Sequence, residues 1–83
     1  KQQDNIPRML QQKDAKDMGP EEIKELFPPD TLLYEIIQCF YSLLLKNKNK
    51  IKMYIFCGQA IAFLGMFPRE SLSMIIVFLN KKL

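Results

Sequence analysis

The chain has 83 residues, a length that accommodates a single domain with a thin hydrophobic core. It carries 12 basic and 9 acidic side chains, a formal net charge of +3, and no histidine. Residues 1–35 hold five basic and eight acidic side chains (net −3), whereas residues 36–83 hold seven basic and one acidic (net +6). We expect one domain over residues 1–83, with a more polar N-terminal segment (1–29) and a hydrophobic helical core (30–83). Because no initiator methionine is present, we also expect the chain to be a fragment of a larger protein.

The composition argues against catalysis. Without histidine, the hydroxyls of Ser42, Ser71 and Ser73 have no imidazole base, and the sequence contains neither a glycine-rich phosphate loop nor paired carboxylates in its apolar part. Cys39 and Cys57 lie in apolar, helical-looking sequence, where free cysteine behaves as a small buried hydrophobe. Two cysteines cannot complete a structural zinc site within one chain, and a disulfide is the less favoured alternative. We therefore expect a non-enzymatic protein with no cofactor and no metal site.

Two helices are predicted in the polar segment. Residues 1–17 favour a first helix, in which Asn5 caps the N-terminus and Pro7 falls in the first turn. A Met-Gly-Pro sequence then interrupts it, because glycine suits a helix C-terminus and proline cannot continue the helix. A short second helix is predicted over residues 20–27, with proline at its first position and a proline pair after its end.

Residues 30–46 predict a third helix, with Asp30 or Thr31 as its N-cap. Tyr34 and Tyr41 are seven positions apart, nearly two turns, and therefore share one side of this helix. Asparagine and lysine residues follow in a polar turn, where asparagine can end one helix and cap the next. The expected core stripe of this helix consists of Leu33, Ile36, Ile37, Phe40 and Leu44.

Residues 51–65 form the most apolar stretch, in which only Lys52 and Gln59 are polar. A helix that is apolar nearly all round is a buried helix, since a surface helix has one wet face. Gly58 indicates the close approach of a neighbouring helix, and Gly65 is suited to ending this one. The fold class is therefore predicted to be all-α: a compact four-helix bundle with a short extra N-terminal helix, built around a central buried helix 51–65.

A last helix is predicted after Pro68, with Ser71 as its N-cap. Its apolar residues recur at helical spacing, but residues 74–79 are also rich in the β-branched side chains that favour a buried strand. We prefer the helix, because a lone strand would have no visible partner. The expected stripe is Leu72, Ile75, Ile76 and Leu79.

Two other classes of binding are weakly favoured. The apolar run 53–67 has fifteen residues, fewer than the roughly 20 that a membrane-spanning helix needs, so we expect no membrane insertion. Four lysines lie in or beside the turn at residues 47–52, but the chain has only two arginines and no nucleic-acid-binding motif. Direct nucleic-acid binding is therefore unlikely on compositional grounds.

An apolar surplus is the main functional indication. The stripes of several short helices and both faces of the central helix must all be covered, and a chain of this length is expected to leave part of them exposed. Exposed apolar patches with polar rims mark partner sites, and an amphipathic helix that docks into a groove is the usual occupant. The open alternative is that the N-terminal helices fold back and cover everything. The expected partner groove is lined by Tyr34, Tyr41, Phe56, Phe63 and Phe67.

Three apolar spacings resemble a known family. Leu33-x-x-Ile36-Ile37-x-x-Phe40 precedes the polar turn, and Ile51-x-x-Tyr54-Ile55-Phe56 and Ile61-x-x-x-Gly65-x-Phe67-Pro68 follow it. Over residues 32–68 this pattern resembles the AP2-coincident domain (ACDC) of AP2-type apicomplexan transcription factors. The resemblance implies a four-helix, nuclear, non-catalytic module beside a separate DNA-binding domain, which recruits other proteins. It carries over no individual functional residue.

The sequence thus predicts a non-catalytic protein–protein interaction module of a larger, transcription-regulating protein, intracellular and by resemblance nuclear. Its partner is another protein that binds through an amphipathic helix. The alternative is a homodimerisation module whose apolar surplus is buried in a symmetric interface. A DNA-binding or membrane-associated helical hairpin is the least favoured reading.

Overall fold

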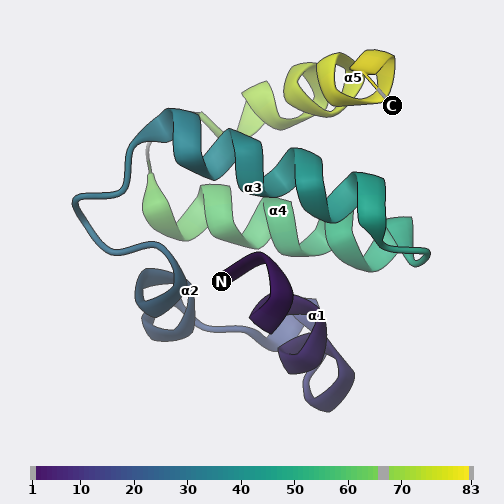
Figure 1. Cartoon of the computed structure of the whole chain (residues 1–83). Helices are drawn as coiled ribbons and strands as arrows, with labels where there is room; N and C mark the ends of the chain where they lie inside the picture. Colours follow the sequence, from purple (N-terminus) through teal and green to yellow (C-terminus); the bar gives the residue numbers. More distant parts are fainter. Residues whose placement is uncertain (1, 66–67, 83) are drawn as a thin grey trace.

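The structure, a computed structural model, describes residues 2–65 and 68–82 (Figure 1). Every regular element over these residues is helical, which confirms the all-α prediction and excludes the strand considered for residues 74–79. The labels η1 and η2 denote 3-10 helices. The elements are α1 (Gln2–Gln12), η1 (Ala15–Asp17), α2 (Pro20–Leu26), α3 (Leu33–Lys46), α4 (Lys50–Leu64), η2 (Arg69–Ser71) and α5 (Leu72–Lys82).

The first helix differs from its prediction at both ends. α1 starts before Asn5, which therefore lies inside the helix rather than at its N-cap, and Pro7 lies beyond the first turn. Ile6 and Leu10 lie one turn apart on the same side of this helix, and both are buried. At the other end the chain leaves the helix after Gln12 and forms η1, so the predicted continuation to residue 17 is wrong. This break allows η1 to pack against α4.

Side chains and glycine end the central helices as the sequence predicts. The Asn47 amide donates to the carbonyl of Leu43 at the end of α3 (2.8 Å), and Asn49 Oδ1 accepts from the backbone N–H of Lys52 at the start of α4 (3.1 Å). Gly65 follows α4 with φ 62°, a left-handed conformation in which a side chain is strained.

The N-cap predicted for α3 at Asp30 or Thr31 is wrong. The helix begins at Leu33 with Leu32 as its N-cap residue, and no side chain caps it. Neither Asp30 nor Thr31 takes that role, because the N–H of Thr31 bonds back to the carbonyl of Pro28 (2.8 Å) in a turn that continues the proline pair. At the C-terminal helix, η2 ends at Ser71 and α5 starts at the next residue.

The helices form layers around α3 and α4. Figure 1 shows α3 and α4 side by side and antiparallel, with α5 on one side of the pair and α1 and α2 on the other. α4 contacts α2, η1, α3 and α5. Close approach at Gly58 is confirmed, since a Cβ atom built there would lie 3.2 Å from Leu72 Cδ2 of α5. The Cα radius of gyration, 11.6 Å, is that of a compact chain of this length.

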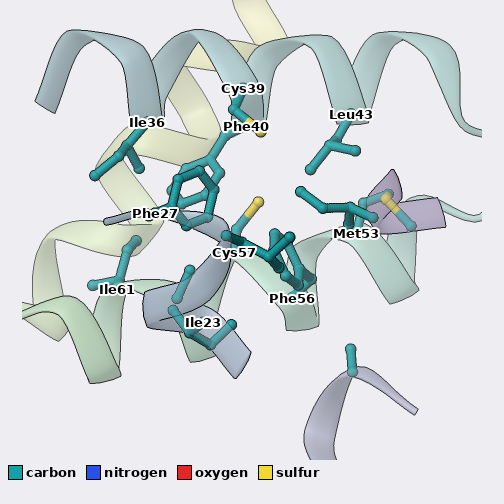
Figure 2. Packing of buried hydrophobic residues seen from close by; sticks show 14 of the residues in the cluster. Ile23, Phe27, Ile36, Cys39, Phe40, Leu43, Met53, Phe56, Cys57 and Ile61 are labelled. Carbon is teal, nitrogen blue, oxygen red and sulfur yellow. The ribbon is translucent and has the colours of Figure 1, made fainter. Parts of the chain in front are cut away.

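The core draws on the whole chain and is not confined to residues 30–83. Figure 2 shows side chains of α2, α3 and α4 meeting in its centre. Phe27 packs edge-on against Phe40, with ring centroids 6.2 Å apart, and also against Phe56 at 6.4 Å. The polar segment is sparsely apolar, but its few apolar side chains are spaced so that they point inward. It supplies seven of the eighteen buried hydrophobic side chains among the described residues: Ile6, Leu10, Ala15, Met18, Ile23, Leu26 and Phe27.

Candidate protein-interaction surface

The exposed apolar side chains gather on α3 and α5. The N-terminal helices cover one side of the α3–α4 pair, but α5 is a single helix on the other side and is itself apolar nearly all round (Figure 1). It turns Leu79 into the core and leaves other apolar side chains in solvent. Large hydrophobic residues more than a third exposed are Leu32, Leu33, Tyr34, Leu45, Ile51, Ile55, Met74, Val77 and Phe78.

A groove of about 420 Å³ lies between α3 and α5. The two helices run in the same direction, and each supplies one wall (Figure 1). Gln38 is the one residue among the lining groups with an amide side chain, and its Nε2 donates to the hydroxyl of Tyr34 (2.8 Å). The lining residues are Tyr34, Ile37, Gln38, Tyr41, Phe78 and Leu79.

A second hollow, of about 340 Å³, lies on the outer side of α5 and joins the groove through Phe78, which lines both. Its other lining residues are Ser73, Met74, Val77 and Lys81. Positions 74, 77, 78 and 81 recur at i, i+3, i+4 and i+7, so they form a continuous stripe along one side of the helix. We call the residues that line these two hollows the α3–α5 surface.

The structure places the predicted groove residues in three different environments. Tyr34 and Tyr41 do lie together on one side of α3, and both line the groove. Phe56 is fully buried, 0% exposed, and its ring packs against Phe27 at the end of α2, so its assignment to a partner groove is wrong. Phe63 is partly buried against the core and lines neither hollow. Phe67 lies outside the described residues.

Sequence reasoning missed the contribution of α5. Phe78 belongs to the predicted apolar surplus but not to the predicted groove, and Met74 and Val77 belong to neither. A helix with apolar side chains all round needs neighbours on every side to cover them. This argument was used for residues 51–65, and it applies equally to residues 72–79. In α4 the neighbours cover most of the periphery but leave Ile51 and Ile55 exposed, and in α5 the side turned away from the core remains exposed.

The two cysteines are free and buried in the core, on the facing helices α3 and α4 (Figure 2). Burial raises the pKa of the Cys39 thiol to about 11. Burial, followed by the nearby Cys39, raises the pKa of Cys57 still further. Because the thiolate is the reactive form, both groups are inert thiols at neutral pH.

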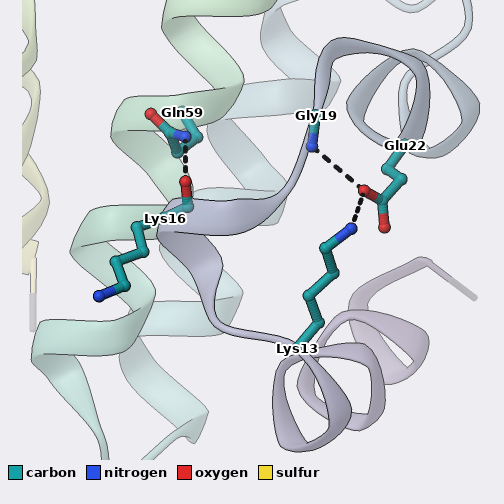
Figure 3. A network of polar contacts seen from close by, with 5 residues as sticks. All are labelled: Lys13, Lys16, Gly19, Glu22 and Gln59. Carbon is teal, nitrogen blue, oxygen red and sulfur yellow. Dashed lines mark hydrogen bonds and ion pairs between the residues drawn. The ribbon is translucent and has the colours of Figure 1, made fainter.

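Polar contacts on the opposite side of the molecule serve to hold the N-terminal segment in place. Figure 3 shows Lys13 paired with Glu22 (2.7 Å) and Gln59 of α4 donating to the carbonyl of Lys16 (3.0 Å). Glu22 also accepts from the backbone N–H of Gly19 (3.1 Å). The hydrogen bond from Lys13, with that from Gly19, lowers the pKa of Glu22. Each of these side chains bonds to a group of the chain itself, so the cluster is structural.

Other surface hollows have mixed polar and apolar linings. A hollow of about 280 Å³ is lined by Ile51 and Ile55 of α4 together with charged side chains. One of about 390 Å³ between α1 and α2 is lined mainly by amide and charged side chains, including Arg8 and Glu25. Over residues 2–65 and 68–82, no three His, Cys, Asp or Glu side chains come together as metal ligands would. Within the same residues, no helix has both the length and the apolar composition needed to cross a bilayer. The α3–α5 surface is therefore the strongest candidate site.

Comparison with known proteins found no matching family model, no matching curated protein and no matching solved structure.

Proposed function

We propose that this chain is a non-catalytic protein–protein interaction module that binds a helix of a partner protein on the α3–α5 surface. The observation that carries the proposal is the groove between two parallel helices, which continues onto the exposed stripe of α5. Two helices that expose apolar side chains along a common groove can bury the apolar face of a third. In this proposal α4 is the central helix of the bundle, and the surrounding helices present the binding surface.

The size of the surface fits a docked helix. From the exposed fractions of its large side chains, the apolar area is on the order of 500 Å². That is at the upper end of the largest apolar patch on a typical monomer, which is often functional. It falls short of the roughly 800 Å² per partner of a standard protein–protein interface, which includes the polar rim.

The proposed setting is that of a larger, transcription-regulating protein. It rests on the resemblance to the AP2-coincident domain alone, which implies an intracellular, nuclear location and an apicomplexan source. The absence of histidine and the inert thiols support the non-catalytic part of the proposal.

The experiment is a selection of random 16-residue peptides, displayed on phage, against the immobilised domain. A helix of 16 residues is about 24 Å long, enough to follow α3. Selected peptides are then titrated by calorimetry against the wild type and two variants, Tyr34→Asp and Ile51→Asp. Tyr34 is 69% exposed and Ile51 73%, and each is the second residue of its helix, where a negative charge is favourable.

Only Tyr34 lies on the α3–α5 surface. We expect Tyr34→Asp to weaken binding at least tenfold, because it places a charge in an apolar groove, and Ile51→Asp to change it less than twofold. Equal losses in the two variants, or a selection that enriches no peptide, would contradict the proposal.

Homodimerisation is the second candidate, because the same exposed stripe on α5 could pack against its copy. Molar mass by light scattering after gel filtration, over a hundredfold range of concentration, separates the two. A dimer at every concentration that Tyr34→Asp converts to a monomer would establish the homodimer. A monomer throughout favours the foreign helix.

A further inference from the structure

The α3–α5 surface has an asymmetric charge distribution. Its lining residues include one charged side chain, Lys81, and no carboxylate. Because α3 and α5 run in the same direction, their C-terminal ends lie at the same end of the groove (Figure 1). Lys46 lies in the last turn of α3 and Lys48 directly after it, and both are exposed.

The opposite end of the groove carries the acidic groups. Glu35 lies in the first turn of α3, and Glu70 lies in η2, just before α5. Both are exposed. Arg69 precedes Glu70 in η2, so Glu35 is the acidic group that marks this end, and Lys81 on the wall of the surface marks the positive end.

The helix dipoles impose a direction on any helix in the groove. Each α-helix has a partial positive charge at its N-terminus and a partial negative charge at its C-terminus. Since α3 and α5 are parallel, their dipoles reinforce each other along the groove. A third helix is favoured when it runs antiparallel to both, with its N-terminus at the lysine end. Acidic side chains are themselves favoured in the first turn of a helix, which in this orientation lies close to Lys81.

These observations specify the chemistry of the occupant more closely than the apolar area does. We propose that the α3–α5 surface binds an amphipathic helix with acidic side chains in its first turn, running antiparallel to α3 and α5. This inference rests on the proposed function and names its class of partner. The exposed helix of a second copy, α5, has no acidic residue in its first turn and does not match this description.

The inference can be tested with three synthetic 18-residue peptides, which share an alanine-rich helix with large apolar residues at i, i+4 and i+7. The first carries three glutamates in its first turn, the second carries them in its last turn, and the third has glutamine in their place. Each carries fluorescein at a lysine on its polar face, and binding to the whole chain is measured by fluorescence anisotropy at 50 and 300 mM salt.

We expect the first peptide to bind about tenfold more tightly than the glutamine peptide at low salt, and more tightly than the second. The advantage should shrink to about twofold at 300 mM salt, because exposed charges are screened over about 6 Å there. Lys81→Gln should remove most of the affinity advantage of the first peptide at low salt. Lys24→Gln is the matched control, since this exposed lysine of α2 lies on the opposite side of the α3–α4 pair and should leave it unchanged.

Orientation has its own readout. A nitroxide at the N-terminus of the first peptide should broaden the backbone amide resonances of Lys46 and Lys81, and leave those of Glu35 and Glu70 sharp. Broadening at the glutamate end would overturn the antiparallel orientation.

Equal affinities for the three peptides would overturn the acidic partner, as would no binding by the first peptide. Neither result decides the proposed function, which depends on the unbiased selection and on the contrast between Tyr34→Asp and Ile51→Asp. Selected peptides that bind the groove but carry no acidic first turn would confirm the function and refute the inference.

Discussion

Phe56 and Phe78 provide a direct test of which apolar side chains form the core and which form the surface. Phe56 is 0% exposed and packs against Phe27, whereas Phe78 is 54% exposed. The two Phe→Ala changes remove the same atoms from two environments. Because the deleted atoms are the same, any difference between the two losses of unfolding free energy reflects how deeply each side chain is buried.

The magnitudes follow from burial. Truncating a fully buried phenylalanine costs about 3–5 kcal/mol, through lost transfer free energy and the cavity left behind. Phe78 is less than half removed from water, so its truncation should cost about 1 kcal/mol. A domain of this size has a free energy of unfolding of about 4–12 kcal/mol. Phe56→Ala should thus remove about a quarter or more of the free energy of unfolding.

Urea unfolding followed by circular dichroism at 222 nm measures both variants. With a slope of about 1 kcal/mol per molar urea, we expect the midpoint to fall by about 3 M or more for Phe56→Ala and by about 1 M for Phe78→Ala. If Phe56→Ala is unfolded without urea, Phe56→Leu is the milder substitution, with an expected loss of about 1–2 kcal/mol. Equal losses for the two alanine variants would refute the placement of Phe56 in the core and of Phe78 at the surface.

Three further outcomes are expected elsewhere in the molecule. Gln59→Ala removes the hydrogen bond to the Lys16 carbonyl that holds η1 on α4. It should lower the free energy of unfolding by about 1 kcal/mol and speed amide hydrogen exchange in η1. Unchanged exchange in η1 would contradict this role of Gln59. Gly65→Ala places a side chain at φ 62°, where no neighbouring atom offers a contact that would offset the backbone strain. The variant should lose about 1 kcal/mol of unfolding free energy, and its melting temperature should fall by about 5 °C. A stabilised variant would show that α4 does not end in this conformation. Cys39 and Cys57 should resist alkylation by iodoacetamide at pH 8 in the native state and react in denaturant, as measured by mass spectrometry. The reason is that both thiols are buried and that the pKa of Cys39 is raised to about 11. Rapid alkylation of the native protein would show that the core opens.

Local helix formation was predictable from local chemistry. Residues 50–64 are helical because an asparagine cap, an apolar periphery and a terminal glycine all act within the segment, and each was recognised in the sequence. The same holds for α2, where proline at the first position and the following proline pair set both ends. The cap predicted at Asn5 was wrong, because α1 already starts at Gln2 and Asn5 lies inside the helix.

The candidate site was only partly predictable. The seven-residue spacing of Tyr34 and Tyr41 determined that they share one side of a helix, whatever that side faces. Which apolar side chains are covered depends on where the helices lie relative to one another, and periodicity carries no information on that. Phe56 and Phe78 are equally apolar in the sequence, yet the first is buried in the core against Phe27 and the second is more than half exposed.

The sequence by itself determined the charge asymmetry between the two halves. It predicted the helical class and an apolar surplus, and it left open whether the N-terminal helices cover that surplus. Only the tertiary structure decided that the sparse apolar side chains of the polar segment complete the core, and that the excess lies on α5 beside α3. The physical reason is that burial is a property of contacts between segments far apart in the chain. Helix propensity and capping depend on neighbours within a few residues.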